Sequence, residues 1–184
     1  DMVEQRKRHV YVTLEGPDDG GDFGRNTPGT STGGIQEGFD YAHANGRDMT
    51  IFGGRGGMHE GDLSSDNVYT LHETLRVPWS QDFRLDGGNY VMSYVGQTGD
   101  AVVIDSQMSC KYKFGLVVSQ SKDGAAVRIQ PKESGPDDFV TMVTTTFEFP
   151  AVVGSDVGIL LDATYGNIQW CRILTEETNT MRTG

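Results

Sequence analysis

Short apolar segments separated by turns fill the chain from Asn67 onward and constrain its fold more than any other feature. The turns are rich in Gly, Asp and Ser, as in Asp86-Gly87-Gly88. Many short strands at such spacing predict an all-β fold, either a sandwich, a barrel or a β-solenoid. The expected strands are Val68–Val77, Phe83–Leu85, Tyr90–Val95, Ala101–Ile104, Tyr112–Val118, Ala125–Ile129, Phe139–Phe149, Gly158–Leu161 and Ile168–Leu174.

Apolar and polar residues alternate within these segments. In Cys110–Val118 the even positions are apolar, and the odd positions begin with Lys111 and Lys113. Val127 and Arg128 show the same alternation in a later segment. Because successive strand residues point to opposite faces, each strand is expected to bury one face and expose the other.

A weak internal repeat favours a solenoid among the three folds. Four segments end alike, in Leu85-Asp86, Ile104-Asp105, Ile129-Gln130 and Leu161-Asp162. The last residues of these pairs are spaced 19, 25 and 32 residues apart. Coils of roughly 20–30 residues with loop insertions would give this spacing, whereas a sandwich gives no reason for it.

One amphipathic helix, at about residues 32–46, is expected before the strands. Ile35, Phe39 and Ala42 recur at helical spacing and form an apolar stripe. Its expected cap residues are Ser31 or Thr32 at the start and Gly46 at the end. Residues 1–30 are expected to form an N-terminal arm and loop with one short strand, Val10–Leu14.

Three segments around this helix carry a resemblance to a known family. They read GDFG at Gly21–Gly24, TSTGGIQE at Thr30–Glu37 and IFGG at Ile51–Gly54. Residues 21–54 thereby resemble the N-terminal signature of pectate-lyase-like right-handed parallel β-helix proteins, where a D-F-G turn leads into a T-x-x-I-Q helix. The sequence departs from the family at Arg25–Gly29, where an Asp-rich D-G-x-x-D-D segment is usual.

The resemblance implies both a fold and a function. The implied fold is an all-β, right-handed parallel β-helix over residues 31–184, with one N-terminal capping α-helix. The implied function is that of an extracellular or cell-surface protein that binds or cleaves polysaccharide, as a lyase or a glycoside hydrolase. The chain is short for the family, so we expect a fragment, a processed product or one part of an assembly. The alternative is a catalytically silent structural β-helix, such as a filament, spike, adhesin or surface-layer element, that self-assembles as a homo-oligomer.

Four residues are candidates for catalysis. Asp82, Arg84 and Asp86 should share one outward side of a strand, where two carboxylates around a guanidinium could act as acid and base. The alternative is a solvated row of ion pairs. Asp105 is added because Asp86, Asp105 and Asp162 would form a carboxylate ladder if the coils align, able to bind calcium or cleave glycosides. Such aspartates also serve simply to accept backbone N–H groups at turns.

Basic and aromatic side chains supply the candidates for substrate binding. Lys111, Lys113, Arg128 and Lys132 are expected to form one basic outward patch, which could hold an acidic polysaccharide or supply a base. Charge balance against neighbouring aspartates is the alternative. Trp79 and Tyr165 are expected to be exposed for sugar stacking, whereas the other candidate aromatics, Tyr90, Tyr94, Tyr112 and Trp170, fit the core better.

Calcium is the one cofactor for which the sequence offers candidates. Asp18, Asp19 and Asp22 lie together in a glycine-rich turn, but the D-x-D-x-D-G spacing of a calcium loop is absent. Cys110 and Cys171 allow either one long-range disulfide or two reduced thiols.

The charge balance bears on the partners. The chain has 15 Lys and Arg against 26 Asp and Glu, a net charge of −11. This balance argues against nucleic acid, whose phosphates need a basic footprint. The sequence contains no run of eighteen apolar residues, so we expect no segment that inserts into a membrane. A neutral or cationic ligand therefore fits the protein as a whole.

Overall fold

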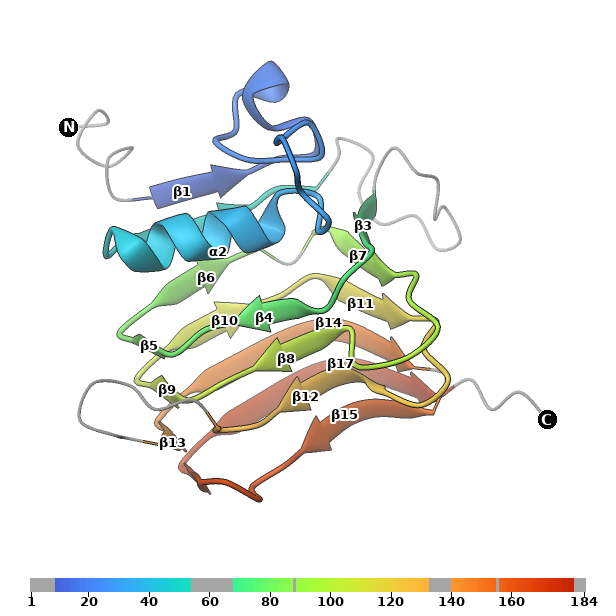
Figure 1. Cartoon of the computed structure of the whole chain (residues 1–184). Coiled ribbons are helices and arrows are strands. Elements are labelled where there is room, and N and C mark those ends of the chain that lie inside the picture. The colour runs from blue at the N-terminus through green and yellow to red at the C-terminus, as the bar shows by residue number, and fades with distance from the viewer. Residues whose placement is uncertain (1–8, 54–67, 88, 133–139, 155, 181–184) are drawn as a thin grey trace.

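The computed structural model describes residues 9–53, 68–87, 89–132, 140–154 and 156–180, and this part of the chain is mostly β-structure (Figure 1). Its strands form three sheets, and every strand pair in them is parallel. The all-β expectation is confirmed. The antiparallel pairing of an up-and-down barrel or a sandwich does not occur among these pairs.

The three sheets differ in size. Sheet A contains β1 (His9–Val12), β2 (Asp48–Ile51), β3 (Val68–Leu71), β6 (Arg84–Asp86), β7 (Val91–Tyr94), β10 (Lys111–Lys113), β11 (Leu116–Ser119), β14 (Thr146–Gly154) and β17 (Arg172–Thr180). Sheet B contains β4 (Leu75–Val77), β8 (Val102–Ile104), β12 (Ala125–Ile129) and β15 (Val157–Leu161). Sheet C contains β5 (Ser80–Gln81), β9 (Gln107–Met108), β13 (Thr141–Val143) and β16 (Asn167–Gln169).

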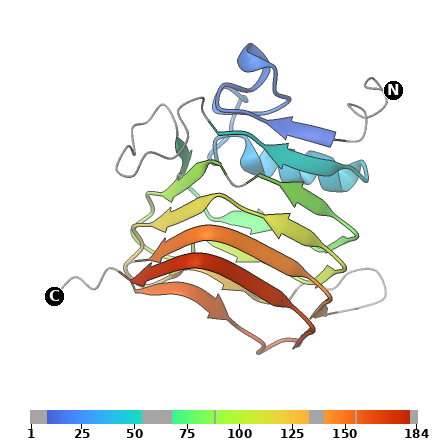
Figure 2. The ribbon, with the colours of Figure 1, turned by 180° about the vertical axis from the view of Figure 1, so that it is seen from behind.

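The chain visits these sheets in a repeated order, which we call a circuit. Strands β6 and β7 lie in sheet A, β8 lies in sheet B and β9 lies in sheet C; β10 to β13 repeat this order. In the next circuit the long strand β14 replaces two strands, because its halves pair with β10 and with β11. Each strand thus pairs with its counterpart one circuit away, and the circuits stack (Figures 1 and 2).

The interior of this stack is a continuous apolar core. One column runs through sheet A by backbone register, namely Val10, Met49, Leu85, Tyr112, Phe147 and Ile173. Aromatic rings stack within the core: the centroids of Tyr112 and Phe147 are 5.4 Å apart, and those of Phe114 and Phe149 are 5.0 Å apart. The predicted inward and outward alternation therefore builds the core.

The helix occupies the expected place, with one correction at its start. Helix α2 spans Ile35–Ala44 and buries the apolar stripe of Ile35, Phe39 and Ala42. It begins after Gly34, so the prediction that Ser31 or Thr32 caps it is wrong. The hydroxyl of Thr32 nonetheless accepts the Gln36 N–H at 3.0 Å. Gly46 has a φ of 58° and ends the helix as predicted. A short 3-10 helix, η1 (Gly16–Asp19), lies in the preceding loop.

Helix α2 also covers an exposed strand edge. It packs against β1, β2 and β4, and β4 is the edge strand of sheet B. The side-chain amide of Gln36 donates to the Arg76 carbonyl at 2.9 Å and accepts the Arg76 N–H at 2.8 Å. Gln36 therefore satisfies the backbone groups that a further strand would pair with, which protects this edge from pairing with another chain.

Replacing Gln36 with alanine should lower the free energy of unfolding by about 1–2 kcal/mol, because two hydrogen bonds to the edge of β4 are lost. Urea unfolding measures the change. Asp40→Ala is the matched control, since it removes only the contact between Asp40 and the Gln36 amide. Equal losses in the two variants would contradict edge capping by Gln36.

Several expected strands are shorter or divided in the structure. The expected segment Val68–Val77 divides into β3 and β4, and the segment Tyr112–Val118 is interrupted between β10 and β11. At this interruption the alternation shifts, because Val117 is fully buried. A Cβ atom on Gly115 would lie 2.1 Å from the Tyr90 carbonyl oxygen, so the close backbone approach requires glycine. Gly54, at the end of the family signature, and Phe139, at the start of one expected strand, lie outside the described residues.

The two cysteines are free thiols. Cys110, Thr145 and Cys171 directly precede the neighbouring strands β10, β14 and β17, so the two cysteines are two strands apart with Thr145 between them. The Cys110 N–H donates to the Thr145 hydroxyl, and the N–H of Arg172, the residue after Cys171, donates to the Thr145 carbonyl. Burial raises the pKa of both thiols. Of the two readings of the sequence, the one with two reduced thiols is confirmed. In the described ranges no helix has the length and apolar character needed to cross a membrane.

Candidate functional site

The outward side of sheet A carries a dense group of charged side chains. We call it the charged face, and it consists of Arg84, Asp86, Lys111, Lys113, Glu148 and Arg172. These residues alternate with the buried column along β6, β10, β14 and β17, so the same pleat that fills the core directs them outward. Figure 2 views the molecule from the side on which the long strands of this sheet lie.

Backbone register places these side chains in rows across the strands. Lys111 lies between Arg84 and Thr146, and Thr146 lies next to Arg172. Neighbouring members of a row lie about 4.8 Å apart, because this is the spacing of adjacent strands in a sheet. The Lys111 ammonium is 3.3 Å from a Glu148 carboxylate oxygen, in a pair that remains partly exposed. Such a pair contributes little to stability and leaves its groups available to a ligand.

The charged face is mixed in sign. It has four basic and two acidic residues, and the carboxylates of Asp48 and Asp82 flank it. The Arg84 N–H donates to the Asp48 carboxylate at 3.0 Å, which holds Asp48 beside this face. The surface therefore offers hydrogen-bond donors and acceptors in nearly equal supply rather than one strong charge.

A groove of about 830 Å³ adjoins this face where sheet A bends. Its lining includes Asn89, Lys113, Glu148, Pro150 and Leu174, from successive strands and the turn before β7. The bend follows from the breaks between the strands of each circuit, and β14 changes its partner from β10 to β11 between Glu148 and Val152. The volume lies within the range of small-molecule binding sites.

An aromatic cluster lies at the β1 end of sheet A. The rings of His9 and Tyr11 are stacked 6.2 Å apart, and those of Tyr11 and Phe52 are stacked 5.9 Å apart. Phe52 is 46% exposed. Sequence reasoning missed this cluster, although the alternation of Tyr11 with buried Val12 could have placed it outside.

Asp82, one of the predicted catalytic residues, lies beside the charged face. It stands where the chain passes from sheet C to sheet A, and we call this point a corner of the circuit. It has a φ of 54°, a conformation that aspartate tolerates better than most residues. The same corner recurs in every circuit described, at Asp82, Ser109, Thr144 and Trp170, each with positive φ. The position of Asp82 therefore follows from chain geometry, while its side chain is exposed.

Trp170 is placed wrongly by the sequence reasoning, which assigned it to the core. It is 78% exposed at the last of these corners. A bulky residue with positive φ is uncommon, and the alternation pattern gives no sign of it because the corner interrupts the strand.

The prediction that Asp86, Asp105 and Asp162 form one carboxylate ladder is wrong for Asp86. Asp105, Gln130 and Asp162 are equivalent, because the Gln130 N–H donates to the Ile104 carbonyl and the Asp162 N–H donates to the Ile129 carbonyl. Asp86 instead lies in sheet A. The repeat seen in the sequence is therefore genuine for sheet B and coincidental for Asp86.

Asp105 serves the fold rather than the charged face. It is 8% exposed, and one carboxylate oxygen accepts the Ser106 N–H at 2.9 Å and the Lys132 N–H at 2.7 Å. This is the alternative reading of such aspartates, as acceptors at turns.

Asp105→Ala is expected to lower the free energy of unfolding by about 1–3 kcal/mol, because two backbone N–H groups lose their acceptor. Asp105→Asn keeps an oxygen at this position and should cost less. Denaturant unfolding of both variants tests this. An alanine variant as stable as the unmodified chain would contradict the assignment.

The predicted basic patch divides between two sheets, so the prediction of a single patch is wrong. Lys111 and Lys113 lie in sheet A, whereas Arg128 lies in sheet B. Arg128 binds Asp100 at 2.6 Å and Asp162 at 3.0 Å. Hydrogen bonds from Thr164, and then the Arg128 guanidinium, lower the pKa of Asp162.

The two predicted stacking residues lie outside the charged face itself. Tyr165 is 57% exposed and lies under the Lys132 ammonium, 5.2 Å from its ring centroid. Trp79 is half-buried, beside His43 at the end of α2. Each ring therefore contacts another side chain of this chain.

Each of the three calcium candidates accepts a hydrogen bond from a different residue of the N-terminal segment. The Asp18 carboxylate accepts from Asn26, that of Asp19 accepts from Thr13, and that of Asp22 accepts the Tyr11 N–H at 2.8 Å. Within the described residues, no group of three or more His, Cys, Asp or Glu side chains is placed to hold a metal ion.

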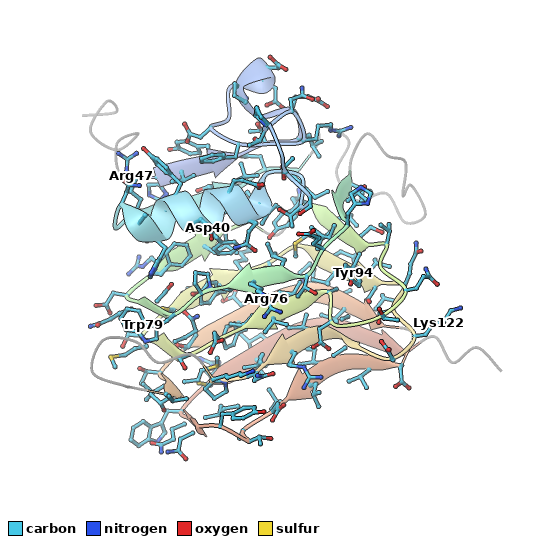
Figure 3. All side chains as sticks on the ribbon, in the orientation of Figure 1. Asp40, Arg47, Arg76, Trp79, Tyr94 and Lys122 are labelled. Carbon is cyan, nitrogen blue, oxygen red and sulfur yellow. The ribbon has the colours of Figure 1, made fainter. Side chains whose placement is uncertain are left out.

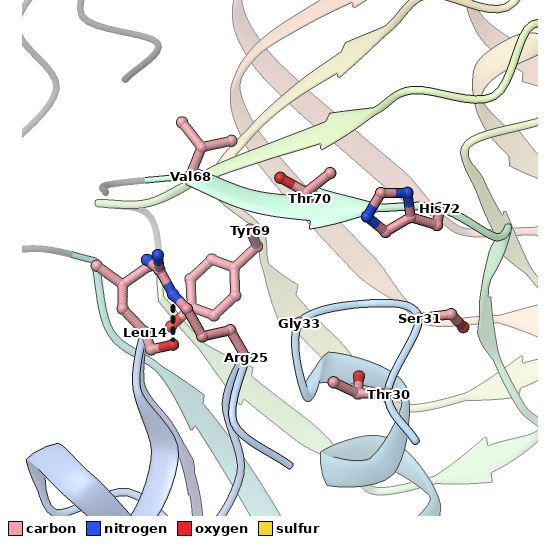
Figure 4. A pocket seen from close by; sticks show the side chains of 9 residues that line it. All are labelled: Leu14, Arg25, Thr30, Ser31, Gly33, Val68, Tyr69, Thr70 and His72. Carbon is pink, nitrogen blue, oxygen red and sulfur yellow. Dashed lines mark hydrogen bonds between the residues drawn. The ribbon is translucent and has the colours of Figure 1, made fainter. Parts of the chain in front are cut away.

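A smaller pocket of about 210 Å³ lies between the N-terminal loop and β3 (Figure 4). The Arg25 guanidinium donates to the Leu14 carbonyl at 3.1 Å at its rim, and the Tyr69 hydroxyl donates to the Phe52 carbonyl at 2.6 Å. The first bond holds the N-terminal loop together and the second joins β3 to the residue after β2, so we assign the pocket to folding.

Comparisons with protein-family models, with curated proteins and with solved structures each find no match.

Proposed function

We propose that this chain is a right-handed parallel β-helix of the pectate-lyase-like kind, whose charged face binds a neutral polysaccharide outside the cell. The observation that carries the proposal is the set of outward side chains, mixed in sign, that cross successive strands of sheet A in rows beside the 830 Å³ groove. A surface built of repeated strands suits a ligand built of repeated units.

Sugar hydroxyl groups both donate and accept hydrogen bonds, and the charged face supplies partners of both kinds. Arg84 and Lys113 donate, while Asp86 and Glu148 accept. The stacked pair of Tyr11 and Phe52 adds an aromatic surface at one end. The net charge of −11 repels a polyanion, so it favours a neutral polymer as the ligand.

The repeated order of the three parallel sheets supports the β-helix part of the proposal. So does α2, which covers the edge of β4 as a capping helix would. In this reading each circuit is one coil, and corners such as Asp82 and Ser109 are the points where the coil turns.

We propose binding rather than cleavage. Glycoside cleavage by two carboxylates requires their surroundings to give them different roles, one as acid and one as base or nucleophile. Asp82 and Asp86 are both exposed, and Asp105 is committed to the fold. The charged face therefore has groups that can hydrogen-bond to a sugar polymer. Its exposed carboxylates share similar surroundings, which do not give them the two different roles that cleavage requires.

Electrophoresis through gels that contain a polysaccharide tests the proposal. The panel comprises β-glucan, xylan and galactan as neutral polymers and polygalacturonate as the polyanion. We expect at least one neutral polymer to retard the protein at both low and high salt. Retardation by polygalacturonate alone, lost as salt is added, or by no polymer would overturn the proposal.

A second candidate is the self-assembling structural element. Strands β15 and β16 are the outer edges of sheets B and C, and no strand pairs with their outward side among the described residues. Leu161, Trp170 and Leu174 are exposed in the same last circuits. Sedimentation velocity over a range of protein concentrations tests this: a concentration-dependent oligomer would support it, and a monomer throughout would contradict it.

A further inference from the structure

A second cavity, of about 490 Å³, lies beside the charged face. It is bounded by the C-terminal end of α2 and by the corner before β6. Its lining includes His43, Arg47, Asp48, Trp79 and Asp82. Figure 3 places Arg47 and Trp79 at the same end of the helix.

Trp79 lines this cavity, and its ring is half-buried. Its indole Nε1 is shielded from solvent and has no hydrogen-bond partner within the described part of the chain. The ring meets His43 edge-on, with centroids 6.4 Å apart and planes at 82°. The part of this half-buried ring that remains exposed gives a ligand an apolar surface to pack against.

The cavity also holds acceptors. Asp48 and Asp82 both line it, and neither makes an ion pair within the described residues. Asp48 accepts the Arg84 N–H, so one wall of the cavity is in contact with the charged face. A matching ligand has hydroxyl groups that donate to carboxylates and an apolar side that packs on an aromatic ring.

We propose that this cavity binds a single uncharged sugar ring of the polysaccharide held on the charged face. The inference deepens the proposed function and rests on it. A sugar ring combines, in one rigid body, the hydroxyl donors and the apolar surface that the cavity requires. The cavity volume is within the range of small-molecule sites.

The indole resonances of the two tryptophans provide the test. Methyl glycosides of glucose, galactose, mannose and xylose are titrated into ¹⁵N-labelled protein. We expect at least one of them to shift the Trp79 indole signal in a saturable manner and to leave the exposed Trp170 signal unchanged. Asp82→Asn should weaken this binding at least tenfold, because a carboxylate acceptor is lost while the corner conformation is kept.

No Trp79 shift with any of the four glycosides, or equal shifts of Trp79 and Trp170, would overturn the inference. Trp79→Ala, which removes the aromatic surface, should weaken binding as well. The two proposals can fail separately. Gel retardation without a Trp79 shift would remove only the sugar-ring cavity, whereas a Trp79 shift without retardation would remove the polysaccharide face.

Discussion

Phe147→Ala is expected to lower the free energy of unfolding by about 3–5 kcal/mol. Phe147 is fully buried at the middle of the inward column, and its ring lies nearly parallel to that of Tyr112, at 11°. The change leaves a cavity between two circuits that the backbone hydrogen bonds on either side prevent from closing. Urea unfolding, followed by circular dichroism, measures the loss.

Thr146→Ala is the matched control on the same strand, because the Thr146 side chain points outward. It should change the free energy of unfolding by no more than about 0.5 kcal/mol. Similar losses in the two variants would show that β14 does not divide its side chains between a core and a solvated face.

Removing two cations from the charged face should weaken polysaccharide binding at least tenfold. Arg84→Ala combined with Lys113→Ala deletes donors on neighbouring strands β6 and β10, one of which also lines the groove. Hydrogen bonds made by charged groups contribute about 1.5–3 kcal/mol each, and about 1.4 kcal/mol corresponds to tenfold in affinity. Titration calorimetry with the polysaccharide that retards the protein measures the change.

Lys122→Ala is the control for this pair, since Lys122 is exposed in the turn between β11 and β12, away from the charged face. Its affinity should match that of the unmodified chain. An equal loss in the control would indicate a general charge effect, and an unchanged affinity in the double variant would place the binding site elsewhere.

Much of the fold follows from local sequence pattern. The alternation around Tyr112 reports the core, and the spacing of Ile35, Phe39 and Ala42 reports the helix. The pattern fails where a backbone corner or a close approach intervenes. Gly115 lies against the Tyr90 backbone, and the shift of alternation there depends on a neighbouring circuit rather than on nearby residues.

The site is harder to predict because it depends on which sheet each strand enters. Arg84 and Lys111 were placed outward correctly, since alternation alone decides that. Asp86 and Asp105 both follow an aliphatic residue at the end of a strand. Asp86 belongs to sheet A and Asp105 directly follows a strand of sheet B, and only the pairing between circuits reveals this difference. Arg128 was grouped with Lys111 for the same reason.

Amide chemical-shift mapping tests the central claim most directly. An oligosaccharide of the retained neutral polysaccharide is titrated into labelled protein. The largest shifts should fall on the outward residues of β6, β10, β14 and β17, together with the groove near Asn89. Shifts confined to β8, β12 and β15 in sheet B, or no shifts at saturating ligand, would contradict a polysaccharide-binding face on sheet A.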